Sequence, residues 1–181
     1  MPHIDLGNDE PGIRSLFMYR PETAHPMRML AEILLRGPST LSRGERELIA
    51  TYVSARNGCG YCTASHAACA SAQLPEGMTL VDQVRADPET APVTAKLSAL
   101  LRISAAVQEG GKAVRAEDVA AARAAGATDL EIHDAVLIAA AFCMYNRYVD
   151  GLATTLRPDQ AAYAAAAQVI LNDGYLPAAQ A

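Results

Sequence analysis

The sequence predicts an all-α fold, a helical bundle formed by a single domain over residues 1–181. Alanine fills 37 of the 181 positions, tryptophan is absent and β-branched residues are sparse, so the chain favours helix. No segment alternates apolar and polar side chains as a half-buried strand does. Two capping boxes, Ser42 with Glu45 and Thr128 with Glu131, mark helix starts. One domain of this length can bury about 70% of its unfolded surface.

Turn residues divide the rest of the chain into expected helices. Residues 1–21 show no clear periodicity and are expected to form an irregular arm, and residues 172–181 a loose tail. The expected helices run over residues 26–36, from about 43 to 57, from 59 or 60 until Pro75, over 80–85, 93–109, 116–125 and 128–151, and from Pro158 to about 172.

Charge and composition exclude several classes of protein. The net charge of −5 and pI near 5.3 argue against nucleic acid or an anionic membrane surface as partner. The first residues carry an acidic cluster and no apolar stretch of the signal-peptide kind. The longest apolar run, residues 135–145, is too short to span a bilayer. Four cysteines with only one close pair do not form a secreted disulfide framework, so we expect a cytoplasmic protein.

Residues 47–69 carry the chemistry that the sequence predicts. Cys59 and Cys62 form a C-x-x-C pair, His66 follows four residues later, and Glu47 lies twelve residues before Cys59. On a helix, positions 59, 62 and 66 share one face. A helix N-terminus favours the thiolate over the thiol, and an imidazole one turn away can exchange a proton with it. This pattern indicates thiol redox chemistry, with these four residues as catalytic candidates.

Three alternative interpretations concern the same stretch. A C-x-x-C pair can also be half of a metal site. On one continuous helix, however, Cys59 and Cys69 would lie about 15 Å apart, whereas zinc ligands lie within about 2.3 Å of the ion. A site of three of these ligands, completed from elsewhere, stays open. Cys69 is expected to be a small buried side chain. Glu47 points away from the apolar stripe of its helix, which favours a solvated glutamate, but Ala50 and Ser54 on its face leave room for a packed helix.

The spacing of these residues resembles a known active-site motif. The pattern E-x11-C-x2-C-x3-H resembles that of the alkylhydroperoxidase D-like family, within the carboxymuconolactone decarboxylase-like superfamily. The surrounding RELIATYVSARNGCGYCTASH is similar to the peroxidase-related branch. FCMYNRYVDGLA, which contains Asn146, Arg147 and Asp150, is similar to the Asn-Arg-x-x-Asp-Gly-Leu segment of that branch. The resemblance covers most of residues 10–155.

The resemblance implies a helical homotrimer or homohexamer and a cysteine-based peroxidase that uses no haem, metal or other cofactor. By this analogy Cys62 reacts with a hydroperoxide and forms a sulfenic acid, and Cys59 resolves it into a disulfide. Glu47 and His66 relay the proton, and an external dithiol of the lipoyl or thioredoxin kind is the reductant. The sequence departs from the family at Tyr61, where better-studied members carry histidine.

A second hypothesis uses the same cysteine pair without catalysis, as a thiol redox sensor or disulfide carrier. Turnover of cumene hydroperoxide separates it from the peroxidase.

Assembly is also predicted from the residues alone. The run 135–145 is apolar all round and must be covered on every side, so we expect another subunit of a homo-oligomer to supply some of the cover.

Overall fold

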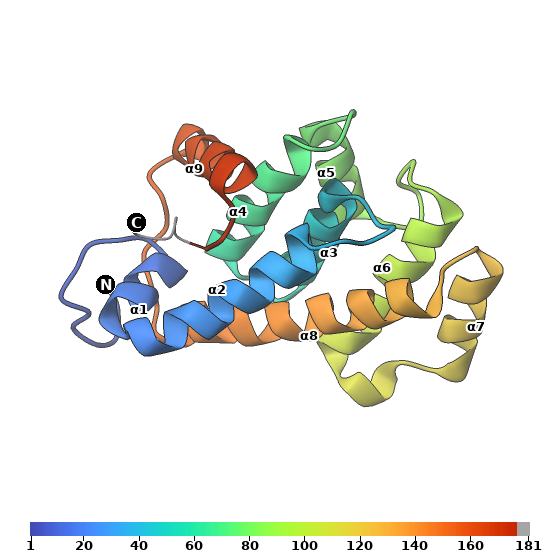
Figure 1. Cartoon of the computed structure of the whole chain (residues 1–181), viewed down its shortest axis with the longest axis horizontal. Coiled ribbons are helices and arrows are strands. Elements are labelled where there is room, and N and C mark those ends of the chain that lie inside the picture. The colour runs from blue at the N-terminus through green and yellow to red at the C-terminus, as the bar shows by residue number, and fades with distance from the viewer. Residues whose placement is uncertain (177–181) are drawn as a thin grey trace.

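The computed structural model describes residues 1–176, which form nine α-helices, one short 3-10 turn and no strand (Figure 1). The predicted all-α fold is therefore confirmed. The helices are α1 (Ile13–Tyr19), α2 (Pro21–Arg36), α3 (Arg43–Arg56), α4 (Gly60–Ser71), α5 (Met78–Ala86), α6 (Ala95–Glu109), α7 (Ala116–Ala124), α8 (Asp129–Gly151) and α9 (Gln160–Asp173), with the 3-10 turn at Gly111–Ala113.

Both capping boxes predicted from the sequence are present. The Ser42 hydroxyl accepts from the Glu45 backbone N–H, and the Glu45 carboxylate accepts from the Ser42 N–H in return. Thr128 and Glu131 do the same at the start of α8. Each pair satisfies two backbone donors that a helix start leaves free. The predicted starts of α3 and α8 are therefore confirmed.

The N-terminal arm differs from the prediction. α1 forms inside the stretch expected to be irregular, and α2 begins at Pro21 and continues through Pro26 instead of starting there. Proline costs no hydrogen bond in a first helical turn, so Pro21 is a suitable start. The seven residues of α1 are too few to show a periodic pattern, and tertiary burial of Leu16 holds them in place.

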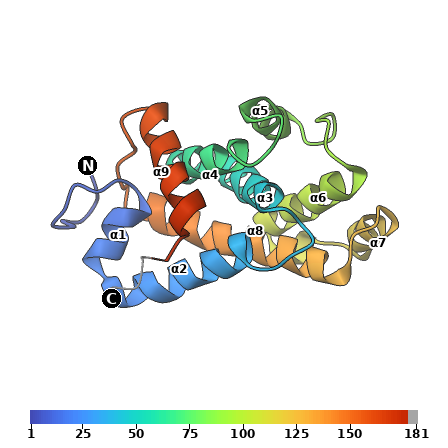
Figure 2. The ribbon, with the colours of Figure 1, turned by 45° about the horizontal axis from the view of Figure 1, so that its top comes forward.

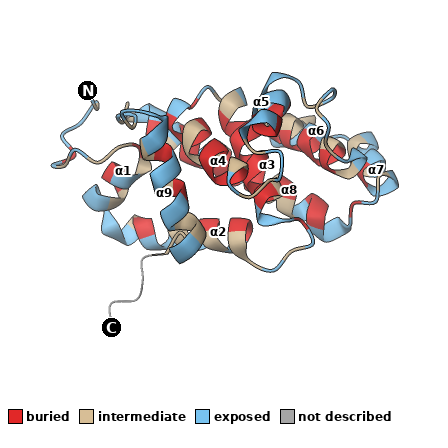
Figure 3. Cartoon of the chain, turned by 90° about the horizontal axis from the view of Figure 1, so that it is seen from above, coloured by how far each residue is buried: buried red, intermediate tan, exposed pale blue. Residues whose placement is uncertain are grey.

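A pair of packed helices, α3 and α4, lies at the centre of the molecule. α8 runs along the length of the fold and packs on α3 and α6, and α2 lies beside it (Figure 1). α9 lies across α4 (Figure 2). The main core is formed where α3, α6 and α8 meet, around Leu48, Leu100 and Ile138. Figure 3 shows the buried residues gathered on α3, α4 and the facing side of α8.

A second, smaller hydrophobic cluster surrounds the cysteines. It contains Cys59, Cys62 and Cys69 with Tyr61 and Tyr163, closed by small residues of α4 and α9. Burying a large apolar side chain stabilises a fold by roughly 1.5–3 kcal/mol. The packing of α9 on α4 therefore removes the cysteine-bearing helix from water.

Candidate active site

The turn between α3 and α4 fixes the position of the first cysteine. The Cys59 N–H donates to the Ser54 carbonyl and the Gly58 N–H to the Ala55 carbonyl, which is the Schellman pattern at the end of a helix. Gly58 has φ of 73°, a left-handed conformation that glycine adopts without a steric penalty. Cys59 then caps α4, and Cys62 lies in its first turn. The two thiols are therefore held at a helix N-terminus, as the spacing predicted.

The pKa values of the two thiols are shifted in opposite directions. A hydrogen bond with Cys62, together with burial, raises the pKa of the Cys59 thiol. The same hydrogen bond lowers the pKa of Cys62, against the effect of burial and with help from the charge of His66 and the Asn146 amide. Cys59 is completely buried and Cys62 is 3% exposed. Cys62 is therefore the more acidic thiol of the pair.

Glu47 and His66 form an ion pair across the α3–α4 interface. The His66 Nδ1 lies 2.7 Å from the Glu47 Oε2. Glu47 is only 2% exposed, so the solvated alternative for this residue does not hold. Burial lowers the pKa of His66, but the charge of Glu47 and the hydrogen bond to it outweigh burial and raise that pKa overall. The imidazolium is thereby favoured beside the Cys62 thiolate.

Tyr175 completes this cluster, and the sequence analysis did not single it out. Its hydroxyl donates to the Glu47 Oε1 at 2.5 Å, and its ring stacks on the His66 ring with centroids 6.2 Å apart. Burial and the charge of Glu47 raise the pKa of the Tyr175 phenol well above its ordinary value, so the hydroxyl stays a donor. The edge of the Phe142 ring closes the other side of His66.

Two residues of α2, distant in sequence from Tyr175, hold it over the ion pair. Its N–H donates to the Glu32 carboxylate at 2.7 Å. Arg36, which pairs with Glu32, donates to the carbonyls of Ile170 and Leu171 at the end of α9. Part of the tail expected to be loose is therefore anchored, and its remainder, residues 177–181, lies outside the described residues.

Two polar residues of α8, Asn146 and Asp150, influence the pKa values of the thiols, in the segment that the resemblance had marked. Asn146 is buried, donates to the Ser54 hydroxyl at 3.1 Å and accepts from the Asn57 amide at 2.8 Å. Its amide also helps to lower the pKa of Cys62. The Asp150 carboxylate helps to raise the pKa of Cys59. Arg147 is exposed and donates to a carbonyl of its own helix.

The other two candidate positions serve packing. Burial and the nearby charge of Glu47 raise the pKa of the Cys69 thiol, against a contact with Tyr175 that lowers it, so the protonated thiol is favoured. Tyr61 turns its ring onto the backbone of Gly12, where an added Cβ would lie 2.3 Å from the ring atoms. Burial raises the pKa of the Tyr61 phenol. Neither side chain takes part in the Glu47–His66 contact.

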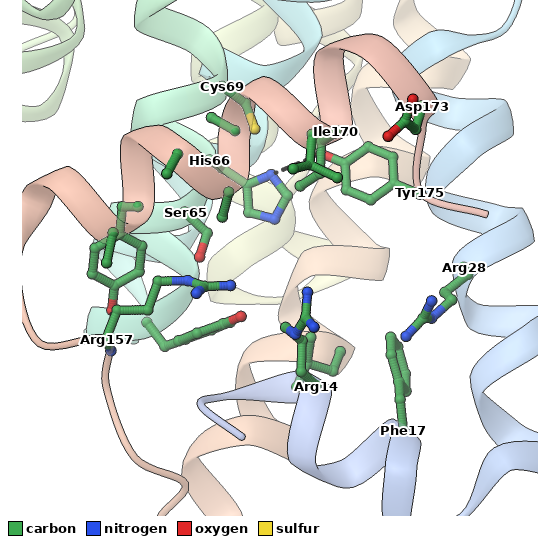
Figure 4. A pocket seen from close by; sticks show the side chains of 18 of the residues that line it. Arg14, Phe17, Arg28, Ser65, His66, Cys69, Arg157, Ile170, Asp173 and Tyr175 are labelled. Atoms are coloured by element: carbon green, nitrogen blue, oxygen red, sulfur yellow. Dashed lines mark hydrogen bonds between the residues drawn. The ribbon is translucent and has the colours of Figure 1, made fainter. Parts of the chain in front are cut away.

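A pocket of about 720 Å³ opens beside His66, between α9 and α4 on one side and α1 and α2 on the other. Figure 4 shows the His66 ring at its inner end, with Tyr175 and Cys69 beside it and three arginines, Arg14, Arg28 and Arg157, around the opening. Within residues 1–176, no three His, Cys, Asp or Glu side chains gather closely enough to hold a metal ion. In the same part of the chain, no helix combines the length and apolar character needed to cross a membrane.

Comparison with known proteins agrees with this fold. Residues 21–74, which include Glu47, both paired cysteines and His66, match the Carboxymuconolactone decarboxylase family. None of the curated proteins matches this chain. The fold is similar to two solved structures.

One is an alkylhydroperoxidase AhpD core, an uncharacterized peroxidase-related protein from Ralstonia eutropha JMP134. It is 25% identical, with a TM-score of 0.76, over 83% of this chain and 78% of that one. The other is an uncharacterized peroxidase-related protein from Silicibacter sp. TM1040, 26% identical with a TM-score of 0.76, over 85% of this chain and 78% of that one.

The family match over residues 21–74 and the two solved structures thus support an alkylhydroperoxidase D-like helical fold of the carboxymuconolactone decarboxylase-like kind, and the resemblance stated from the sequence is confirmed.

Proposed function

We propose that this protein is a cysteine-based peroxidase that reduces organic hydroperoxides through a Cys59–Cys62 dithiol and disulfide cycle. Cys62 is the peroxidatic residue, Cys59 the resolving residue, and Glu47 with His66 the proton relay. The proposal extends the peroxidase-related family assignment to a defined reaction on named atoms.

In the first step the Cys62 thiolate attacks the terminal oxygen of the hydroperoxide. The S–O bond forms as the O–O bond breaks, and the leaving alkoxide takes a proton from the His66 imidazolium to become the alcohol. Cys62 is left as a sulfenic acid. Tyr175, by donating to Glu47, fixes the carboxylate that in turn orients His66.

In the second step the Cys59 sulfur attacks the Cys62 sulfur. The new S–S bond displaces hydroxide from the sulfenic acid, and the Cys59 proton converts it to water. An external dithiol, of the lipoyl or thioredoxin kind, then reduces the disulfide by thiol exchange and returns the proton to His66. One hydroperoxide and two thiols thus give one alcohol, one water and one disulfide.

The observation that carries the proposal is the charged Glu47–His66 pair, 2.7 Å apart and buried, beside two thiols whose pKa values are shifted in opposite directions. Burying an ion pair costs desolvation energy, so the fold gains little stability from placing one beside the cysteines. Such a pair is what a thiolate nucleophile requires, because perturbed groups of this kind cluster at catalytic sites.

The two cysteines are distinguished by trapping. Cys62→Ser should abolish reaction with cumene hydroperoxide. Cys59→Ser should react once, stop, and hold a sulfenic acid that dimedone labels at Cys62, as mass spectrometry after one equivalent of peroxide would detect. Label on Cys59 in Cys62→Ser, with none on Cys62 in Cys59→Ser, would invert the roles.

The redox sensor or disulfide carrier is the second candidate. Both sulfurs are almost completely buried, which slows reduction by a bulky dithiol and so favours the sensor over the carrier. Stoichiometric oxidation without turnover, in the presence of dihydrolipoamide or thioredoxin, would favour it. In either case we place the protein in the cytoplasm, since a C-x-x-C pair there is kept reduced between cycles.

We also propose a homotrimer or homohexamer. α2 and α8 leave several large apolar side chains exposed that a second subunit would cover; these are Met29, Ile33, Leu130 and Met144.

A further inference from the structure

The pocket beside His66 combines an apolar wall with an excess of positive charge. Its wall is formed by Ile13 and Phe17 of α1 and by the alanine-rich face of α9. Its size falls within the range of small-molecule sites, about 300–1,000 Å³. Figure 4 shows three arginines from separate segments of the chain extending toward this space: Arg14, Arg28 and Arg157.

Two of the three arginines lack a carboxylate partner among residues 1–176. Arg14 pairs with Glu10 at 2.7 Å. Arg28 makes no such pair. Its guanidinium packs over the Phe17 ring, 5.0 Å from the centroid, and partial burial and repulsion from Arg14 lower its pKa. The remaining carboxylate at the rim, Asp173, forms no ion pair with either free arginine within the described residues.

Arg157 is the second arginine of the pocket without a carboxylate partner in the described chain. Its Nε is buried and has no hydrogen-bond partner within the described chain. A buried donor without a partner costs about 1–3 kcal/mol, and more when it is charged. Guanidinium groups recognise carboxylates through paired, charge-assisted hydrogen bonds. An anion in the pocket would pair with the guanidinium groups of Arg157 and Arg28, which both line it.

We infer that the pocket binds an organic acid with a long apolar body, its carboxylate held by Arg28 and Arg157 and its chain by α1 and α9. If the proposed function holds, on which this part rests, the acid is a fatty-acid hydroperoxide. His66 lines the pocket and pairs with Glu47 of the relay, and Cys62 lies one helical turn before it on α4 without lining the pocket itself, so the hydroperoxide group would approach Cys62 past His66.

The binding arm of the test needs no catalysis. Laurate and its methyl ester are titrated into the full-length protein by calorimetry. Laurate should bind at least about tenfold more tightly than the ester, since hydrogen bonds to a charged group are worth roughly that factor or more. Arg28→Gln and Arg157→Gln should each reduce this preference about tenfold, and Arg28→Lys should restore part of it.

The matched control is Arg102→Gln. It removes one positive charge from α6, where Arg102 pairs with Glu89 outside the pocket, and should keep the full preference for laurate. Circular dichroism of each variant shows whether the fold is retained. An acid bound no better than its ester, or an equal loss in Arg102→Gln, would overturn the pocket assignment.

The kinetic arm compares linoleic acid hydroperoxide, its methyl ester and cumene hydroperoxide. The ratio of kcat/KM for acid over ester should follow the laurate preference in every variant. Arginine-dependent laurate binding with no peroxide turnover would refute the peroxidase and keep the acid site. Turnover of all three hydroperoxides without preference for the acid would keep the peroxidase and refute the acid site.

Discussion

The substitution Glu47→Gln tests the proton relay most directly. It keeps the shape of the side chain and a hydrogen-bond acceptor for Tyr175, and removes only the charge. At 2.7 Å and an effective dielectric constant of about 20, unit charges attract by roughly 6 kcal/mol. Without that attraction only the weaker effect of the Cys62 charge opposes burial, which is the largest cause, so the pKa of His66 should fall below its ordinary value of 6.5.

Two measurements test whether His66 loses its positive charge in Glu47→Gln. The Cys62 pKa should rise toward its ordinary value of 9.0, because the positive charge of His66 helps to lower it. The ultraviolet absorbance of the thiolate, recorded against pH in a Cys59→Ser background, should therefore shift to higher pH. Turnover of cumene hydroperoxide at neutral pH should fall by about 10² or more, the contribution of a general acid–base group.

Glu131→Gln is the matched control. Glu131 is buried to the same degree, 1% exposed, and pairs with Lys96 at 2.7 Å, but it lies at the start of α8 and takes no part in the site. It should lose stability and keep both the thiolate titration and the turnover. Near-native turnover in Glu47→Gln, with an unmoved Cys62 titration, would refute the relay and leave the helix N-terminus as the source of the thiolate.

Three further predictions use other contacts. Tyr175→Phe removes the donor to Glu47 and should cost about 1.5–3 kcal/mol of unfolding free energy and reduce turnover, both measurable on one preparation. Lys96 and the helix cap lower the Glu131 pKa from 4.5 to about 2 despite burial. The stabilisation that Glu131 contributes is therefore complete above pH 4.5 and lost as the pH falls toward 2. Denaturant titrations should show this fall in unfolding free energy in the unsubstituted protein and not in Glu131→Gln. Light scattering should give an oligomer that Ile33→Asp or Met144→Asp weakens, whereas a stable monomer at micromolar concentration would contradict the assembly.

Short sequence patterns predicted the fold well because the start and end of a helix depend on a few neighbouring residues. The two capping boxes and the glycine and proline stops gave seven of the nine helices nearly at their observed bounds. α1 was missed, and α2 was predicted to start five residues too late. In both cases tertiary burial and an N-terminal proline, rather than a periodic stripe, decide the structure.

The site was predicted only where its residues lie close in sequence. Cys59, Cys62 and His66 share one helix start, so their spacing carried the information. Glu47 was ambiguous because its own helix face is polar, and its burial depends on α4 packing against that face. Tyr175 lies 128 positions from Glu47 in sequence, and no local pattern reports a pairing at that distance.

Tyr61 illustrates how one departure from the family pattern is accommodated. The resembling family carries histidine at this position, next to the reactive cysteine. Here the Tyr61 ring lies against Gly12, whose φ of 58° and absent Cβ both suit glycine alone. The position therefore fastens the N-terminal segment to α4 and forms part of the pocket wall. A phenol with a raised pKa is a poor proton carrier near neutral pH. The proposed proton relay therefore uses Glu47 and His66 without Tyr61, and Tyr175 donates to the Glu47 carboxylate.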